Sequence, residues 1–457
     1  MDKSSQMPGM LTLDKLRKLI DDGEIDTVLV AITDMQGRLQ GKRCSARYFI
    51  EEVAEHGTEG CNYLMAVDVD MNTVEGFSMS SWERGYGDLL MHPDFSTLRM
   101  IPWYPATALV LCDVEWLDSS PVLASPRQVL RRQLERLDDL GFDAYAATEL
   151  ELQIFNNSYE DAFKRGYRDL EASSQYNVDY SMIGTGRVEA LLRDIRNGMG
   201  GAGLYVETAK GECNLGQHEI GFMYDKALTT CDNHSIYKTG AKEIAVQHGK
   251  SISFMAKYDA REGNSCHIHF SLRTKSGESA FAGDNPHGFS PLMEHFLAGQ
   301  VACMEELTYF FAPNINSYKR YVNGSFAPTA IAWGLDNRTC ALRVVGHGES
   351  LRFENRVPGG DVNPYLAVSA LIAAGLHGVE NELTLEPAFE GNAYSSDRTH
   401  VPSTLRDAAE KFGQSELARK SFGDEVVDHY LNAAHVELDA FNAAVTDWER
   451  SRGFERL

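Results

Sequence analysis

The sequence has little of what would place it among membrane or nucleic-acid-binding proteins. Its longest apolar run, residues 366–376, is about half as long as a helix that spans a membrane, so no transmembrane segment is expected. Basic residues are outnumbered, with 43 Lys and Arg against 66 Asp and Glu and a formal net charge of −23. This balance disfavours binding to nucleic acid or anionic lipid. It suits cationic substrates, or anions that are handled through metals or local arginines.

The eight cysteines are scattered and include no CxxC pair. This spacing disfavours a structural zinc site or a disulfide framework, and it predicts reduced thiols in a cytoplasmic protein. The first ten residues, MDKSSQMPGM, show no basic segment followed by an apolar one, so no secretory signal is expected. With 43% hydrophobic and 24% charged residues over 457 positions, the composition predicts a folded protein of roughly two to four folding units.

The chain divides at a linker rich in Pro and Ser. Before it, residues 27–33 alternate apolar and polar side chains, and a tight turn at Gly37 joins them to a second expected strand. Another apolar strand is expected at 109–114, and the linker then leads into a helix. We therefore predict a small α+β unit at the start of the chain and a domain boundary near residue 120, which gives domains of residues 1–118 and 119–457.

Three segments of the larger domain alternate strictly between ionisable and apolar side chains. A strand places residues i and i+2 on the same face. These rows, ionisable apart from Ser271, are Glu149 and Glu151, then His267, His269 and Ser271, then Arg352, Glu354 and Arg356. One such row is typical of a solvated sheet face, but three rows with apolar backs predict one curved sheet with a polar concave side.

A turn-rich segment at 210–219 contributes two more acids, Glu212 and Glu219. If these lie beside the rows, five carboxylates and His267 share one cavity, which is prohibitive without bound cations. Oxygen-rich ligation with one nitrogen suits Mg²⁺ or Mn²⁺ better than zinc or copper. Arginines cluster downstream at Arg320, Arg338, Arg343, Arg352 and Arg356. Divalent metals together with guanidinium groups indicate phosphoryl transfer.

The motifs of this chain, in their order, resemble those of the glutamine synthetase superfamily of the class I bacterial type. They are TDMQGRLQGKR, ELELQIF, GECNLGQHEI, SCHIHFSL, NSYKR, DNRTCALR and RFENRVPGGDVNPYL. The resemblance extends along nearly the whole chain. It implies a small β-grasp domain followed by a larger catalytic domain, whose curved antiparallel sheet forms the active-site funnel. It also implies a double-ring dodecamer with each site built between adjacent subunits.

The resemblance implies a set of site residues for ATP, L-glutamate and two metal ions. One metal site would be formed by Glu151, Glu212 and Glu219, and the other by Glu149, His267 and Glu354. The catalytic arginines implied are Arg338 and Arg343, which clamp the transferring phosphate, and Arg320. Glutamate would bind at Arg320, Arg356 and the backbone of Gly263. Nucleotide contacts are implied for Glu207, His269, Ser271 and Arg352.

The family's chemistry is ATP-dependent amide ligation, in which an amine displaces phosphate from γ-glutamyl phosphate. The sequence of this chain differs from the family motifs at the positions that bind ammonium in glutamine synthetases. The flap reads GSFAP at 324–328, so Phe326 replaces the flap glutamate and cannot accept a proton. The Asp-Gly-Ser-Ser latch is absent, with Asp68 and Asp70 as candidate replacements, and Lys210 stands where the family has histidine.

These departures favour an amine larger than ammonia. The segments FMAKY, APTAIAWG and DNRT resemble the glutamate–polyamine ligase branch. We predict a γ-glutamylamide synthetase for a primary amine, either a polyamine such as putrescine or spermidine or an amino alcohol such as ethanolamine. Phe326 would form an apolar wall, and Glu262, Asp68 or Asp70 would hold a distant ammonium group.

Two other functions are weighed against this prediction. One is an ordinary glutamine synthetase that uses ammonia through an altered pocket, which the loss of the flap acid disfavours. The other is a catalytically silent family member with a structural or regulatory role. A silent member is expected to have lost some metal-ligand residues by substitution, but this chain retains all of them at the matched positions.

Overall fold

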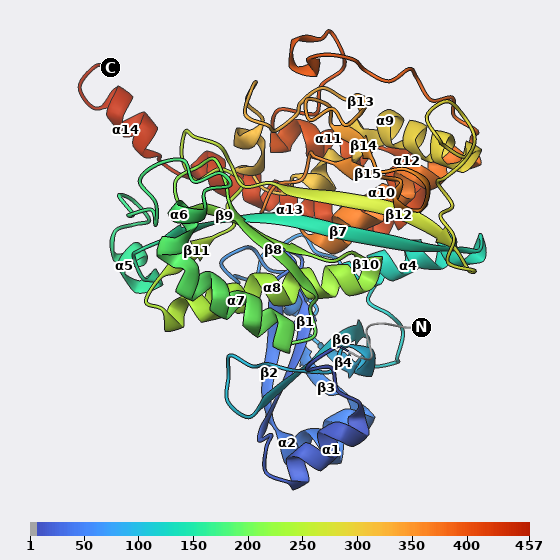
Figure 1. The fold of residues 1–457 in the computed structure, drawn as a ribbon. Coiled ribbons are helices and arrows are strands. Elements are labelled where there is room, and N and C mark those ends of the chain that lie inside the picture. The colour runs from blue at the N-terminus through green and yellow to red at the C-terminus, as the bar shows by residue number, and fades with distance from the viewer. Residues whose placement is uncertain (1–6) are drawn as a thin grey trace.

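The computed structural model describes residues 7–457, so most of the segment examined for a secretory signal lies outside the described residues. Two units are visible in Figure 1, a small N-terminal one with a six-stranded sheet and a larger one with a nine-stranded sheet. The predicted α+β fold is therefore confirmed. The boundary between residues 118 and 119 stays a prediction. It falls between the last strand of the first sheet and the first helix of the larger unit.

The N-terminal unit is a mixed sheet covered by short helices. Its strands lie in the order β2-β1-β6-β4-β3, with β5 also paired to β6, and β1 runs parallel to β6. The strands are β1 (Thr27–Thr33), β2 (Leu39–Ser45), β3 (Thr58–Cys61), β4 (Asp88–Pro93), β5 (Arg99–Met100) and β6 (Thr107–Glu115). The helices are α1 (Leu13–Asp21), α2 (Ala46–Tyr48) and α3 (Ala54–His56).

The predicted hairpin is formed by β1 and β2, which pair antiparallel along their whole length. Asp34 accepts two backbone hydrogen bonds across the turn, at 3.0 and 2.9 Å. Gly37 has a φ of 77°, a conformation that favours glycine. A Cβ at this position would lie 3.3 Å from the side chains of Asn363 and Pro364. The turn therefore lies directly against the larger unit.

The larger unit is built on a sheet in the order β13-β14-β15-β12-β7-β9-β8, with β10 and β11 also paired to β7. β13 runs parallel to β14, whereas β7 pairs antiparallel with each of its partners. The strands are β7 (Phe142–Phe155), β8 (Val206–Gly211), β9 (Gln217–Phe222), β10 (Asp225–Lys226), β11 (Ser251–Ser253), β12 (Cys266–Thr274), β13 (Trp333–Leu335), β14 (Leu342–Val345) and β15 (Arg352–Asn355).

Helices surround this sheet, and the last of them, α14, projects away from the rest of the molecule in Figure 1. They are α4 (Pro126–Asp139), α5 (Tyr159–Lys164), α6 (Met182–Thr185), α7 (Glu189–Gly201), α8 (Ala227–Gln247), α9 (Pro291–Phe311), α10 (Pro364–Glu380), α11 (Leu405–Gln414), α12 (Glu416–Phe422), α13 (Asp424–Ala443) and α14 (Asp447–Gly453). Within residues 7–457, no helix is both long enough and apolar enough to cross a membrane.

Strand alternation separates a polar front of the sheet from an apolar back. Phe270 of β12 and Phe353 of β15 point away from the ionisable rows and contact Phe296 of α9, with ring centroids 5.6 and 6.1 Å apart. Helix α10 packs against α9 and is buried along most of its length. The apolar run at 366–376 is therefore a core helix. This packing fixes the sheet from behind and leaves its ionisable face free.

Candidate active site

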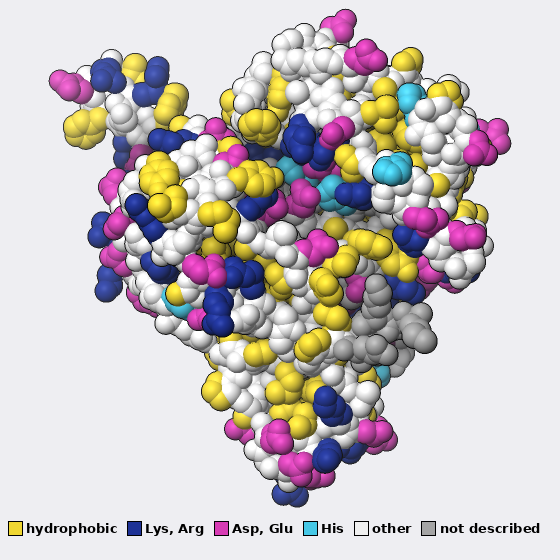
Figure 2. Space-filling view, viewed as in Figure 1, with side chains coloured by type: hydrophobic (Ala, Val, Ile, Leu, Met, Phe, Trp, Pro, Cys, Tyr) yellow, Lys and Arg dark blue, Asp and Glu magenta, His cyan; other side chains and the backbone are white. Residues whose placement is uncertain are grey.

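The register of β7 aligns the predicted ionisable rows. Glu149 lies directly opposite His267 of β12, and Glu151 lies directly opposite Glu219 of β9. Residues paired in this way share one face of a sheet, where like charges destabilise each other. Figure 2 shows acidic, basic and histidine side chains gathered in a hollow of this face. The local sequence alternation and the antiparallel pairing together create one polar concavity.

One carboxylate group lies at the β7–β9 side of the hollow. Glu151, Glu212 and Glu219 each offer an oxygen, and these oxygens lie within 4.8 Å of one another. Burial, together with the nearby carboxylate of Glu212, raises the pKa of Glu151 to about 8. Burial and the charge of Glu149 raise the pKa of Glu219 to about 8. An oxygen-rich, mutually repelling group of this kind fits a divalent cation such as Mg²⁺ or Mn²⁺.

Sequence reasoning missed the residues that orient Glu151. The side-chain amide of Gln217 donates to the Glu151 carboxylate at 3.0 Å, and the backbone N–H of Ser265 donates to it at 2.7 Å. Gln217 also donates to the carbonyl of Gly263 and the side chain of Asn264. The available signal was the i, i+2 spacing of Gln217 and Glu219 on one strand, which places both on the ionisable face.

A second group of possible metal ligands lies around β12. Oxygens of Glu149 and Glu354 and a nitrogen of His269 lie within 4.8 Å of one another. His267 is equally near, with its Nδ1 3.4 Å from Glu149 and 3.3 Å from Glu354. The structure thus brings two imidazoles to these carboxylates, where the sequence prediction assigned one to the metal and the other to the nucleotide.

The two imidazoles differ in their hydrogen bonding. His269 Nε2 lies 2.8 Å from Glu149, and its Nδ1 accepts from Arg352 at 3.2 Å, so both of its nitrogens have partners. Within the described part of the chain, the buried Nε2 of His267 has no hydrogen-bond partner. Burial, reinforced by the charge of Arg356, lowers the pKa of His267 to about 4. His267 is therefore neutral at neutral pH and able to coordinate a cation.

Arginines line the β14–β15 side of the hollow. Arg343 lies opposite Glu354 and donates to it at 2.9 Å, and it also donates to Asp336 at 2.8 Å. Arg356 donates to Glu354 at 2.5 Å and is almost fully buried. Arg338, in contrast, is exposed on the loop between β13 and β14, 3.9 Å from Asp336. Two guanidinium groups held by Glu354 and one exposed group paired with Asp336 therefore lie on this side.

Arg320 lies in the wall of the site. Its guanidinium donates to the carbonyls of residues 356–358 and to Ser265 Oγ, and its side chain is 1% exposed. A Cβ at Gly263 would lie 2.8 Å from the Arg320 side chain, so the backbone at residue 263 is pressed against it. Arg320 thus joins the loop around Gly263 to the loop after β15.

The remaining predicted residues lie at the edges of the hollow. Ser271 follows His269 on the same face of β12, and both it and Arg352 are half-buried. Glu207 is exposed on β8, at the outer edge of the sheet. Glu262 is half-buried, and its carbonyl accepts from Asn214 at 2.7 Å. Phe326 is 58% exposed on the flap. These positions surround the two ligand groups on several sides.

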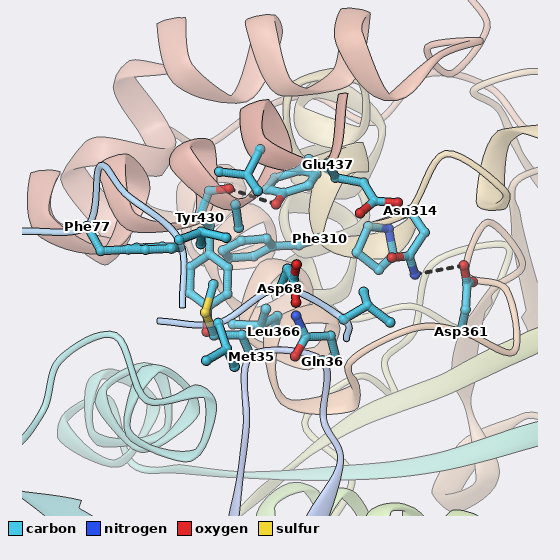
Figure 3. Close-up of a pocket in the computed structure, with 17 residues that line it drawn as sticks. Met35, Gln36, Asp68, Phe77, Phe310, Asn314, Asp361, Leu366, Tyr430 and Glu437 are labelled. Atoms are coloured by element: carbon cyan, nitrogen blue, oxygen red, sulfur yellow. Dashed lines mark hydrogen bonds between the residues drawn. The ribbon is translucent and has the colours of Figure 1, made fainter. Parts of the chain in front are cut away.

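Asp68 lies in a different cavity, shown in Figure 3. Its walls come from the hairpin turn, the loop around Asp68, the end of α9 and helix α13. Phe310 and Tyr430 give this cavity an apolar floor, and Glu437 and Asp361 add carboxylates. Asp68 hydrogen-bonds Asn72 of its own loop. Within one chain, Asp68 is therefore grouped with Glu437 and not with the ligands on the sheet.

Comparisons with known proteins agree with this geometry. Residues 123–453 match the family model for the glutamine synthetase catalytic domain. The chain is 63% identical over 447 residues to gamma-glutamylethanolamide synthetase GlnA4 of Streptomyces coelicolor, covering 98% of this chain and 96% of that protein. It is 37% identical over 444 residues to glutamate–isopropylamine ligase of Pseudomonas sp., covering 96% and 97%.

A solved structure gives the same result at the level of the fold. The GmaS/ADP complex, conformation 1, has a TM-score of 0.85 to this chain at 26% sequence identity, covering 96% of this chain and 99% of that one. Nearly three quarters of the sequence matches the family model, and nearly the whole fold matches the solved structure. The chain belongs to the glutamine synthetase family.

Proposed function

We propose that this protein joins the γ-carboxylate of L-glutamate to a small primary amine, with ATP as the activating substrate. The proposal rests on one observation, that the site keeps its possible metal ligands and arginines but lacks the acid of the flap. The two ligand groups and the arginine rim remain together, whereas the flap presents Phe326 in place of an acid. Ethanolamine is the leading acceptor because the 63% identical relative is named for its ethanolamide product. Isopropylamine follows for the same reason.

We assign Glu151, Glu212 and Glu219 to one divalent cation, and Glu149, His267 and Glu354 to a second. His267 is preferred to His269 as the ligand because His269 already has partners on both ring nitrogens. Mg²⁺ or Mn²⁺ bound at these groups would neutralise charge on the phosphates of ATP and on the transferring group. The raised pKa values of Glu151 and Glu219 support the assignment, since burial and neighbouring carboxylates disfavour the charged forms more than Lys210 stabilises them.

The chain's own cations would act on the substrates. We assign Arg338 and Arg343 to the transferring phosphoryl group, because both guanidinium groups contact Asp336, and that of Arg338 is exposed and able to reach a substrate. Arg320, Arg356 and the backbone of Gly263 would position glutamate. The nucleotide would contact Glu207, His269, Ser271 and Arg352. Holding ATP and glutamate together in this hollow lowers the entropic barrier to reaction.

In the reaction, a γ-carboxylate oxygen of glutamate attacks the terminal phosphorus of ATP, and ADP leaves. The amine nitrogen then attacks the carbonyl carbon of γ-glutamyl phosphate, phosphate leaves, and the nitrogen gives up a proton. Phe326 cannot take that proton, and its ring offers apolar surface to the carbon chain of an amine. We assign Glu262 as the acid on the amine side, because its loop adjoins Gly263 at the ligand groups.

An acceptor panel tests the function. The purified protein with Mg²⁺, ATP and glutamate should release phosphate faster with ethanolamine than with ammonium at matched concentration. Isopropylamine, putrescine and spermidine complete the panel, and mass spectrometry identifies the γ-glutamylamide formed. If ammonium is the best acceptor, the protein is a glutamine synthetase. If ATP binds to no measurable extent and no acceptor supports turnover, the protein is a catalytically silent family member.

We also propose that twelve chains assemble into two stacked rings, as the family resemblance implies. The position of Asp68 is compatible with this, because Asp68 lies apart from the ligand groups of its own chain. Mass photometry should give about twelve times the 50.8 kDa chain mass. A species of one chain mass that turns over ethanolamine would contradict the shared site.

A further inference from the structure

Lys210 lies in line with the first carboxylate group. On β8 it is paired directly with Glu219 of β9, and Glu219 is in turn paired with Glu151 of β7. Residues paired in this way share one face, so the three side chains form a row across three strands. The position of Lys210 therefore follows from the register of the backbone.

The ammonium group of Lys210 touches two of the acids assigned to the metal. Its Nζ hydrogen-bonds Glu212 Oε1 and lies 3.8 Å from Glu219 Oε2. On its other side, the ring of Tyr180 lies with its centroid 5.1 Å from Nζ, a cation–π distance. The lysine side chain is 24% exposed and those of Glu212 and Glu219 are 14% and 11% exposed, so water screens these contacts only in part.

We propose that Lys210 is a tethered counter-cation of the first carboxylate group, which a divalent ion displaces when it binds. In the metal-free protein the lysine neutralises part of the charge of Glu151, Glu212 and Glu219. A divalent ion coordinated by Glu212 and Glu219 occupies the same oxygens, so the ammonium moves aside. This inference rests on the proposed function, because it takes those three residues as metal ligands.

The inference has two consequences for metal binding. Because the lysine competes for the oxygens and repels a like charge, the first site binds its ion more weakly than the same carboxylates would alone. Because the lysine offsets charge in the metal-free state, it also stabilises the protein when no metal is bound. Lys210 thus lowers the affinity of the first site for its ion and raises the stability of the metal-free protein.

The test compares Lys210→Met with a matched control, Lys226→Met. Methionine keeps the length of the stem and removes the charge. Lys226 is exposed on β10, a strand of the same sheet, so its replacement removes one charge away from the ligand groups. Metal-free full-length protein is titrated with Mn²⁺ by calorimetry and by electron paramagnetic resonance of the free ion.

We expect Lys210→Met to bind Mn²⁺ at least about 10-fold more tightly at one site, and Lys226→Met to match the wild type. Metal-free Lys210→Met should unfold at a lower temperature than the wild type and gain more stability from Mn²⁺. Lys210→Arg, which keeps the charge, should bind Mn²⁺ no more tightly than the wild type. Equal or weaker Mn²⁺ binding by Lys210→Met overturns the inference.

A further variant separates this inference from the metal assignment. Glu212→Gln should lose one Mn²⁺ site. If it does so while Lys210→Met binds like the wild type, the metal assignment stands and the role of Lys210 is wrong. If neither the wild type nor Lys210→Met binds Mn²⁺, both are wrong.

Discussion

At the scale of single residues, Phe326 holds a conformation that few bulky side chains adopt. Its φ is 56°, in the left-handed region, and its ring is 58% exposed. Arg356 donates to its carbonyl at 3.4 Å, which ties the flap to the arginine rim. The ring therefore stays turned outward at the mouth of the site, where an amine would enter.

Replacing Phe326 by glutamate should shift acceptor preference toward ammonia. Phe326→Glu supplies a proton acceptor at the mouth and removes apolar surface, so the kcat/KM ratio of ammonium to ethanolamine should rise about 10-fold. The two acceptors are compared by steady-state phosphate release. Phe326→Leu keeps an apolar side chain without an acid, and its ratio should stay near that of the wild type. An unchanged ratio in Phe326→Glu would remove Phe326 from the determinants of specificity.

Loss of Glu151 should abolish turnover. Glu151→Ala takes one ligand from the first ligand group and leaves the backbone N–H of Ser265 without its acceptor, so kcat/KM should fall at least about 100-fold. Steady-state assays give the activity, and circular dichroism verifies the fold. Glu24→Ala, at an exposed position, serves as the control. Wild-type activity in the Glu151 variant would refute the metal assignment.

The sequence predicted this site in part. The spacing of Glu149 and Glu151, and of His267 and His269, identified their shared faces without knowledge of the fold. The contacts of Gln217 with Glu151 could not be predicted in the same way. They depend on which strand pairs with β7 and in which register, and no local pattern encodes that pairing.

At the scale of elements, two helices behind the sheet approach very closely. A Cβ on Gly378 of α10 would lie 2.0 Å from the carbonyl oxygen of His295 and 2.7 Å from the nitrogen of Gly299, both on α9. Phe270 and Phe353, on the back of the strands that carry the histidines and Glu354, pack against the same helix. The α9–α10 contact therefore fixes the position of the sheet.

Gly378→Ala should destabilise the fold. The added methyl group meets backbone atoms that cannot rotate away, so the helices must separate, at a cost of about 1–3 kcal/mol in the free energy of unfolding. Urea denaturation monitored by fluorescence measures the change. Gly200→Ala on α7 is the matched control, because a Cβ there meets nothing within 4 Å. It should stabilise by about 0.5–1 kcal/mol through helix propensity. Equal effects of the two substitutions would contradict the close approach.

The elements differ in how well local sequence predicted them. The β1–β2 hairpin follows from alternation and one tight turn, and the run at 366–376 gave α10 as a buried helix. The parallel pairing of β13 with β14, and the irregularity of β8 near residue 207, could not be predicted. They depend on contacts between segments that are distant in sequence.

At the scale of the whole molecule, His429 of α13 joins the two units. Its ring lies 4.6 Å from that of Phe77, in the long segment between β3 and β4. Burial lowers the pKa of His429 to about 4, although a bond with the backbone of Met65 opposes the shift. Because this pKa lies below the unfolded value near 6.5, the folded state binds fewer protons between the two values. The contribution of His429 to stability is therefore lost as the pH falls.

Acidification should weaken the wild type more than His429→Phe, which keeps a ring against Phe77 but does not titrate. From its folded and unfolded pKa values, His429 should lower the free energy of unfolding of the wild type by about 2 kcal/mol between pH 6.5 and pH 5. Urea denaturation at the two pH values measures this difference. The buried His218 and His234, whose pKa values burial also lowers, preserve part of the pH dependence in both proteins. His435→Gln, at an exposed position of the same helix, should behave like the wild type.

The antiparallel pairing around β7 also bears on how the protein is made. The strands that pair with β7 come from later parts of the chain, first β9 and then β12, which in turn pairs with β15. Glu149 is therefore made well before Glu354, and the second ligand group needs both. Contacts this distant in sequence form slowly, because a long loop must close before they stabilise the fold. A chain still on the ribosome therefore carries early acids without their later partners. The second ligand group can therefore form only after β15 has been made and has paired with β12.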